Sequence, residues 1–386
     1  MRWIVWGIGG LLVVCLGLTG LSFLLNQKLP AQSSVIDRLS EADKARLAEY
    51  FHLRQTVGDA VWPGWTEVDD AALLYNEAYA FLVGVPEPAV GWLTVPGHEL
   101  RGEAWTLVDD DTFMGQPYFR QPLPESGETP QAFTVQVGSI WVGSFQTREW
   151  MEIYFVEQLQ SDLPSFLAAI FPYRLIRPLF IGGSDRYISL FAHESFHAFQ
   201  GAAAEGKLVV AETAVSTHQS QYPWQDANLQ AAWQTELDLL QQALRTETDD
   251  EVADLAQQFL TQRTLRRSNA DLDAELVQYE QHREWVEGLA RYVELEIWRQ
   301  ATANSDYQPV PAIADLPDFN AYGGFETRWD REIDQIARMA GDEGDGRFYY
   351  TGMAQAVLLD RLMPGWKALA MDDGVALEGL LETAVQ

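Results

Sequence analysis

Residues 184–201 read SDRYISLFAHESFHAFQG and contain the pattern HExxH at positions 193–197. Ser184 or Asp185 is a favourable N-cap residue, so this segment predicts a helix that runs to about Gly201. Two histidines four positions apart then lie one turn apart on the same helical face. The opposite stripe is largely apolar, which indicates a buried helix whose polar face points into a cleft.

The histidine face of this helix carries the residue types of a catalytic zinc site. His193 and His197 can bind one Zn²⁺ through their imidazole rings. Glu194 follows the first histidine and can reach a metal-bound water as a general base. Gln200 lies on the same face and can add a hydrogen bond there. The competing interpretation is a chance match, in which two partly exposed histidines flank a solvated glutamate.

A catalytic zinc ion also needs a third protein ligand and an open position for water. No histidine follows the pattern at close spacing, so we expect an Asp or Glu from a distant segment. Residues 284–294, EWVEGLARYVE, predict a helix whose polar face holds Glu284, Glu287 and Glu294. Gly288 inside it costs about 1 kcal/mol relative to alanine, and close approach of another helix would account for it. We predict Glu287 as the third ligand and keep the other two as alternatives; ordinary solvated charges are the competing interpretation.

The strings HESFHAFQ and EGLARY together resemble the zincin metallopeptidases, and within them the gluzincins, whose third ligand is a glutamate on a later helix. The resemblance covers about 110 residues. It implies that His193, His197 and Glu287 bind Zn²⁺ and that Glu194 is the general base. The implied activity is that of a zinc-dependent metallopeptidase, which hydrolyses peptide bonds in a peptide or protein substrate.

One departure from the gluzincin pattern concerns spacing. The 90 residues from His197 to Glu287 far exceed the compact spacing of well-known members, so residues 226–270 would form a helical insertion. Zincins also bind extended peptide by adding it to an edge strand beside the active helix. The order of the chain, with strands before the HExxH helix, is compatible with this mode of binding.

Hydrolysis of a peptide bond needs a second electrophile for the tetrahedral oxyanion, besides the metal. Residues 347–352, RFYYTG, begin a predicted helix, and a tyrosine at such a position could face the cleft. We choose Tyr350 as this group, with Tyr349 and Arg347 as alternatives. The competing interpretation is that these are packing residues, since tyrosine is often half-buried.

The rest of the body predicts an α+β, predominantly helical and zincin-like domain with a strand-bearing N-terminal portion. A helix is expected over residues 40–51, and Asp70 can cap a second helix through residues 71–82. From about residue 90 to 157, runs rich in β-branched and aromatic residues alternate with turn residues, which favours antiparallel strands. The longer helices that follow are expected over residues 226–245, 249–268 and 271–302.

We treat this body, residues 29–386, as one domain. Its first part, 29–165, contains a helix and the antiparallel strands. Its second part, 166–386, is helical and holds the proposed zinc site together with the insertion.

The N-terminus carries an uncharged apolar stretch over residues 3–25. As a helix it would span about 35 Å, enough for a hydrocarbon core of about 30 Å. We therefore expect one transmembrane helix within residues 1–28, which contacts the lipid bilayer through residues 3–25. We expect a single-pass membrane protein whose body lies outside the cytoplasm. A cleaved signal peptide is the alternative, but Leu29-Pro30-Ala31 has leucine where a small residue belongs.

Composition excludes several classes of protein. The chain has 26 Lys+Arg against 56 Asp+Glu, a net charge of −30, which argues against a nucleic-acid partner because phosphate binding needs a basic face. The one cysteine, Cys15, excludes an intramolecular disulfide framework.

Two other functions remain open beside the metallopeptidase. The first is a zinc site that catalyses another hydrolysis, or a catalytically degenerate zincin that acts as a membrane-tethered binding or scaffold module. The second is an interaction domain without a metal, in which the HExxH pattern is accidental.

Overall fold

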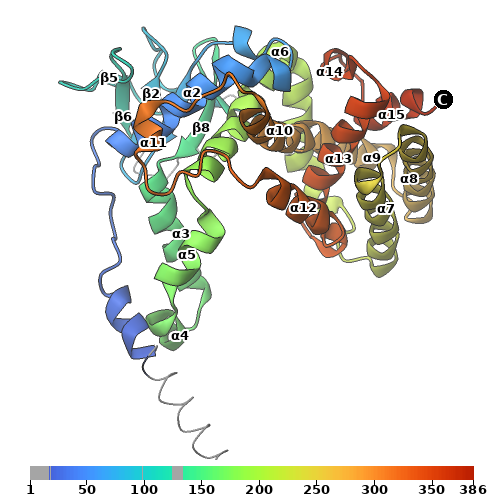
Figure 1. Ribbon diagram of the computed structural model, residues 1–386, viewed down its shortest axis with the longest axis horizontal. Helices are drawn as coiled ribbons and strands as arrows, with labels where there is room; N and C mark the ends of the chain where they lie inside the picture. The colour runs from blue at the N-terminus through green and yellow to red at the C-terminus, as the bar shows by residue number, and fades with distance from the viewer. Residues whose placement is uncertain (1–16, 18, 98, 124–133) are drawn as a thin grey trace, which may run out of the picture.

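Helix α6 (Ser184–His218) carries the HExxH pattern and lies between the sheet and the later helices of the computed structural model (Figure 1). The structure describes residues 17, 19–97, 99–123 and 134–386. The helix bends at Ala204, whose φ of −147° and ψ of 54° are not helical. Its first part is buried, with Ile188 and Phe196 in the main core. The predicted helix is therefore present, and it continues beyond the bend.

An eight-stranded sheet packs against α6, in the order β4-β3-β7-β8-β1-β2-β6-β5. The strands are β1 (Ala72–Tyr75), β2 (Tyr79–Val83), β3 (Trp92–Thr94), β4 (Leu100–Arg101), β5 (Thr106–Leu107), β6 (Phe119–Pro122), β7 (Thr134–Val137) and β8 (Ile140–Gln146). Neighbouring strands run antiparallel except β1 and β8, which are parallel. The sheet is thus mixed, because the chain passes through the six other strands before β8 returns beside β1.

Helix α6 crosses β8 at Gly143, where backbone meets backbone. A Cβ on this glycine would lie 2.8 Å from the Cα of Ser195, so a larger residue would push the helix off the strand. The Ser195 hydroxyl also hydrogen-bonds to the hydroxyl of Tyr50 from α2 (Glu41–Val61). The middle of the HExxH pattern therefore points at the sheet and at α2, which leaves the opposite face of α6 to the two histidines.

Helices make up most of the remaining structure. Those beyond the sheet are α3 (Arg148–Asp162), α4 (Ser165–Ile170), α5 (Tyr173–Ile181), α7 (Ala227–Arg245), α8 (Asp249–Asn269), α9 (Ala274–Arg283), α10 (Leu289–Ala303), α11 (Pro311–Ala314), α12 (Phe325–Ile336), α13 (Gly346–Leu362), α14 (Trp366–Leu369) and α15 (Leu377–Ala384). A π-helical turn (Glu284–Gly288) joins α9 to α10. The long helices expected beyond the strands are confirmed, and α7 and α8 occupy the place of the expected insertion.

The predicted helix over residues 71–82 is wrong, because this stretch forms β1 and β2. Asn76 turns the chain between them, since its side-chain oxygen accepts hydrogen bonds from the backbone N–H groups of Ala78 and Tyr79. Every residue of β1 is buried, paired with β2 on one side and β8 on the other. Pairing with a distant strand has overridden the local helix propensity of this alanine- and leucine-rich sequence.

Two further predictions need correction. One is the fold with a transmembrane helix, and the other is the single-pass membrane location with the body outside the cytoplasm. Within the part of the chain that the structure describes, no helix is both long and apolar enough to cross a membrane. Residues 19–26 are helical, and eight residues span only about 12 Å. Residues 1–16 and 18, which make up most of the predicted anchor, lie outside the described residues.

A buried cluster of charged side chains connects α8 to its neighbours. Arg263 donates hydrogen bonds to Glu236 of α7, Glu284 of the π turn and Glu378 of α15, at 2.7, 2.5 and 2.9 Å. Arg266 donates to Glu236 and to Glu280 of α9, both at 2.6 Å. The arginines are almost inaccessible to solvent, so α8 and four neighbouring elements are held together by ion pairs that water does not screen.

We expect Arg263→Met to lower the free energy of unfolding by about 3–5 kcal/mol, because it leaves three buried carboxylates without their shared partner. Urea denaturation of the purified chain measures this loss. Arg245→Met is the matched control, since Arg245 pairs with Asp334 on the exposed surface and should cost less than about 1 kcal/mol. Equal losses in the two variants would contradict a stabilising role of the cluster.

Candidate metal centre

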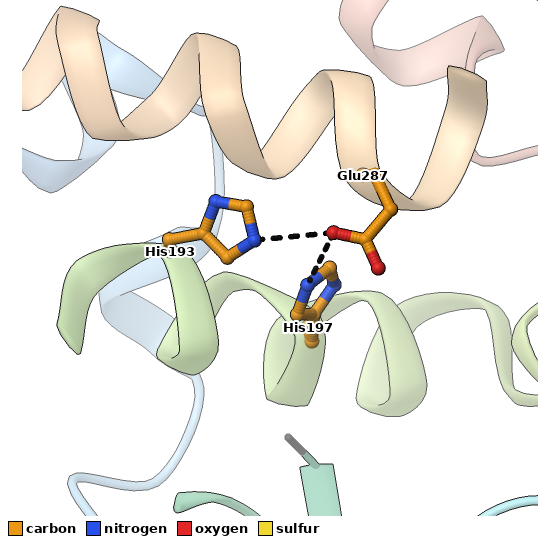
Figure 2. Close-up of side chains that lie close together, drawn as sticks. All are labelled: His193, His197 and Glu287. Atoms are coloured by element: carbon orange, nitrogen blue, oxygen red, sulfur yellow. Dashed lines mark hydrogen bonds and ion pairs between the residues drawn. The ribbon is translucent and has the colours of Figure 1, made fainter. Parts of the chain in front are cut away.

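Two helical segments far apart in the sequence bring His193, His197 and Glu287 together (Figure 2). Glu287 Oε2 lies 3.3 Å from Nε2 of His193 and 3.6 Å from Nε2 of His197. Atoms that bind a tetrahedral zinc ion at 2.0–2.2 Å are about 3.3–3.6 Å from one another. The three side chains are buried and form a cluster of possible metal ligands, as the sequence predicted for these three positions.

The π turn determines where the Glu287 carboxylate lies. Turns of this kind interrupt a helix by one extra residue and often occur at functional sites. Gly288 closes the turn against Gly352 of α13, and a Cβ on Gly288 would lie 2.4 Å from the Cα of Gly352. The predicted close approach of another helix at this glycine is therefore confirmed, although the helix is α13 and not the HExxH helix. Contact with α13 fixes the turn, and the turn presents Glu287 to α6.

Gln200 connects the two halves of the cluster. Its Oε1 lies 2.8 Å from Nδ1 of His197 and accepts a hydrogen bond from it, which leaves Nε2 free to bind a metal. Its Nε2 donates to the backbone carbonyl of Trp285 in the π turn, at 2.8 Å. The predicted hydrogen bond from Gln200 on the histidine face is confirmed, and the link to the π turn is an addition that the sequence did not indicate.

Arg283 holds the second oxygen of the Glu287 carboxylate. Its Nη2 donates to Glu287 Oε1 at 2.7 Å and to Asp345 at 2.8 Å. Burial raises the pKa of Glu287, but Arg283 and the two histidines outweigh it and hold the pKa well below its ordinary value. The carboxylate is therefore ionised, with one oxygen bound and the other directed at the histidines. Its i, i+4 spacing from Arg283 was the available sequence signal for this contact.

The two alternative ligands from the sequence lie elsewhere. Glu284 is bound to Arg263 in the buried ion cluster. Glu294 lies behind His193, with its Oε2 3.9 Å from Nδ1, and ion-pairs with Arg291 and Arg328. Burial opposes ionisation of Glu294, but these arginines lower its pKa to about 2. Glu294 thus places a fixed negative charge behind a candidate ligand instead of acting as one.

Glu194 has a different environment from the carboxylates around it. Burial raises its pKa well above the ordinary value, and the nearby charges of Glu287, Glu294 and Glu212 add to this effect, while His197 opposes it. The carboxyl group therefore holds its proton more tightly than an exposed glutamate, and a divalent cation beside it would favour the ionised form.

Of the two adjacent tyrosines, Tyr349 is the one that contacts the candidate ligands. Its ring stacks on the His193 imidazole, with centroids 5.7 Å apart and an angle of 11° between the planes. Tyr350, the residue chosen from the sequence, instead lies beside Arg291, whose guanidinium is 5.7 Å from the ring centroid. Adjacent residues of a helix point about 100° apart, so a one-residue difference selects another face. The third alternative, Arg347, donates to the backbone carbonyl of Ala340.

The strand next to α6 does not have the free edge that the zincin resemblance implies. Strand β8 is internal, paired with β7 on one side and with β1 on the other. Within the described residues the sheet ends at β4 and β5. An extended peptide could therefore not add to the sheet at β8.

Comparison with known proteins identified no relative: the chain matches no protein-family model, no curated protein and no solved structure. The geometry of the His193–His197–Glu287 cluster is therefore the support for a metal centre.

We expect Gln200→Leu to weaken zinc binding by about 10- to 100-fold, because it removes two hydrogen bonds. One orients the His197 ring, and the other is donated to the carbonyl of Trp285 in the π turn. Competition with a chromophoric chelator measures the affinity. Gln234→Leu is the matched control, since Gln234 also donates to a distant backbone carbonyl, that of Ala337, but does not touch the cluster. An unchanged affinity in Gln200→Leu, or equal weakening in both variants, would contradict this role.

Proposed function

We propose that this chain is a zinc-dependent metallopeptidase of the zincin type, in which His193, His197 and Glu287 bind the metal. The observation that carries the proposal is the position of Glu287 Oε2, which lies from each histidine Nε2 at a distance that suits two ligands of one tetrahedral zinc ion, with all three ligand atoms within 4.8 Å of one another. Two of the ligands also have their other polar atom held by a neighbouring side chain, as metal ligands commonly do. If the three side chains were close only by chance, there would be no reason for Gln200 and Arg283 to hold the other polar atoms of His197 and Glu287.

Zinc fits these donors better than a hard cation does. Two imidazole nitrogens and one carboxylate oxygen are the ligands of many catalytic zinc sites, which keep a fourth position for water. Calcium and magnesium prefer six or more oxygen ligands, whereas this cluster offers two nitrogens. A bound zinc ion would act as a Lewis acid and lower the pKa of a water at the fourth position.

Glu194 is the proposed general base of the reaction. It follows His193 directly on α6, so its carboxylate is within reach of a water beside the ligands. In the metal-free chain burial raises its pKa, so the carboxyl group can hold a proton that it accepts from the water. The proton that Glu194 accepts would then pass to the nitrogen of the leaving amine.

Tyr349 is the proposed donor to the oxyanion, in place of Tyr350. Its ring lies against His193, and burial together with Glu287 raises its pKa far above the ordinary value. The phenol therefore remains protonated at neutral pH and can donate its O–H to a developing negative charge. Tyr350 faces Arg291 and lacks this contact with the ligands.

A catalytically degenerate zincin that serves as a binding or scaffold module is the second candidate. The observation that favours it is the internal position of β8, which removes the substrate-binding edge that the zincin resemblance implies. Such a protein would bind zinc through the same three residues and hydrolyse nothing. Metal content and hydrolysis must therefore be measured separately.

We expect Glu194→Gln to retain one zinc ion per chain and to lose hydrolysis of a denatured protein by about 10²- to 10⁴-fold, because a general base is removed. Elemental analysis and release of soluble peptide are the two measurements. Glu205→Gln, on the same helix but exposed, is the control and should keep both properties. A wild-type chain that holds zinc without any chelator-sensitive hydrolysis would contradict the peptidase and favour the scaffold.

We expect Tyr349→Phe to lower kcat by about 10²- to 10³-fold, the cost of removing one oxyanion donor. Tyr350→Phe should leave kcat nearly unchanged, because its ring lies beside Arg291 and its hydroxyl hydrogen-bonds with Glu332 and Arg291. The two variants remove the same atom from adjacent residues of α13, so steady-state kinetics on one substrate compares them directly. A larger loss in Tyr350→Phe would reverse the assignment.

A further inference from the structure

Exposed apolar side chains are concentrated on one end of the molecule. Helices α3 and α5 form an arm that projects from the body and ends in the short helix α4, next to residues 19–26 (Figure 1). Phe166, Leu175 and Leu179 are 70, 70 and 74% exposed there. Of the 16 exposed large apolar side chains in the described chain, nine belong to this arm or to residues 19–26. We call residues 163–181 together with 19–26 the apolar tip.

Hydrogen bonds hold the two segments of the apolar tip together. Asn26 donates hydrogen bonds to the backbone carbonyls of Ala169 and Phe171, at 3.1 and 2.9 Å. Arg174 donates to the carbonyl of Lys28 at 3.1 Å. A groove of about 430 Å³ with mostly apolar walls runs between these segments. The exposed side chains are therefore presented on a defined surface.

The charge of the apolar tip differs from that of the whole chain. Residues 163–181 contain Arg174 and Arg177 and no acidic residue, whereas the chain as a whole carries a net charge of −30. Arg177 ion-pairs with Glu152 of α3 at 2.9 Å, so Arg174 is the arginine that adds positive charge to this apolar surface. This combination suits the interface of a lipid bilayer, where apolar groups enter the acyl region and arginines meet anionic headgroups.

The sequence next to the apolar tip has the same character. Residues 3–16 precede it and contain no charged residue. The apolar tip is thus continuous in sequence with a second apolar stretch, while the acidic body would be repelled by an anionic surface. A second copy of this chain would explain exposed apolar side chains as well, but it would not account for Arg174 or for the apolar sequence that precedes residue 19.

We propose that the apolar tip lies in the headgroup region of a lipid bilayer, on its surface and without crossing it. Leu175, Leu179 and Phe180 then enter the upper acyl region, and Arg174 remains among the phosphates. The body stands away from the surface at the other end of the arm. This inference does not depend on the metal centre or on peptidase activity.

Site-specific fluorescence of the full chain tests this proposal. Cys15 is the single thiol, so Cys15→Ser with Leu179→Cys gives one attachment point for an environment-sensitive dye. With vesicles of phosphatidylcholine and phosphatidylglycerol, we expect the emission to shift to shorter wavelength. Spin-labelled headgroups should quench it. The same dye at Leu265→Cys on α8, a position that is 51% exposed, should show neither effect.

Three results would overturn the proposal. The first is a dye at position 179 that stays in water while the chain co-sediments with the vesicles. The second is a chain that does not bind the vesicles. The third is a shift that occurs without vesicles and grows with protein concentration, which would assign the apolar tip to contact between two copies of this chain.

Discussion

The structure around the candidate site depends on one buried carboxylate. Glu287 is ionised in the interior, and a buried charge is costly unless it is paired. Arg283 pairs with one of its oxygens, and the two histidines of α6 face the other. The π turn places the Glu287 carboxylate between Arg283 and the histidines. The turn can lie against α13 because neither Gly288 nor Gly352 carries a side chain at their contact. A zinc ion would add the positive charge that this cluster of acidic groups otherwise lacks on its histidine side.

The helices between the two halves of the site have a supporting role. Helices α7 and α8 fill the long spacing between the HExxH pattern and Glu287, and Arg263 of α8 binds Glu284, the first residue of the π turn. The C-terminal segment supports the same turn, since Trp285 donates to the carbonyl of Ala370. Helices α7 and α8 therefore support the π turn that carries Glu287.

The sequence indicated the parts of the site that follow from local geometry. The i, i+4 spacing places His193 and His197 on one face whatever the rest of the fold does. Glu287 could be selected because the glycine after it required a close neighbour. Tyr349 could not be separated from Tyr350, since the choice depends on how α13 is rotated against α6. Strands β1 and β2 were mistaken for a helix because β1 pairs with β8, about seventy residues later, and no local pattern records that partner.

X-ray absorption at the zinc edge tests the central claim most directly, because it reports the ligands of a bound ion without requiring activity. The purified chain, loaded with one equivalent of zinc, should show four nitrogen or oxygen ligands at about 2.0–2.2 Å. The outer shells should show scattering from two imidazole rings, from His193 and His197, and His193→Ala should reduce this to one. Six oxygen ligands without imidazole scattering, or a chain that retains no zinc, would contradict the account.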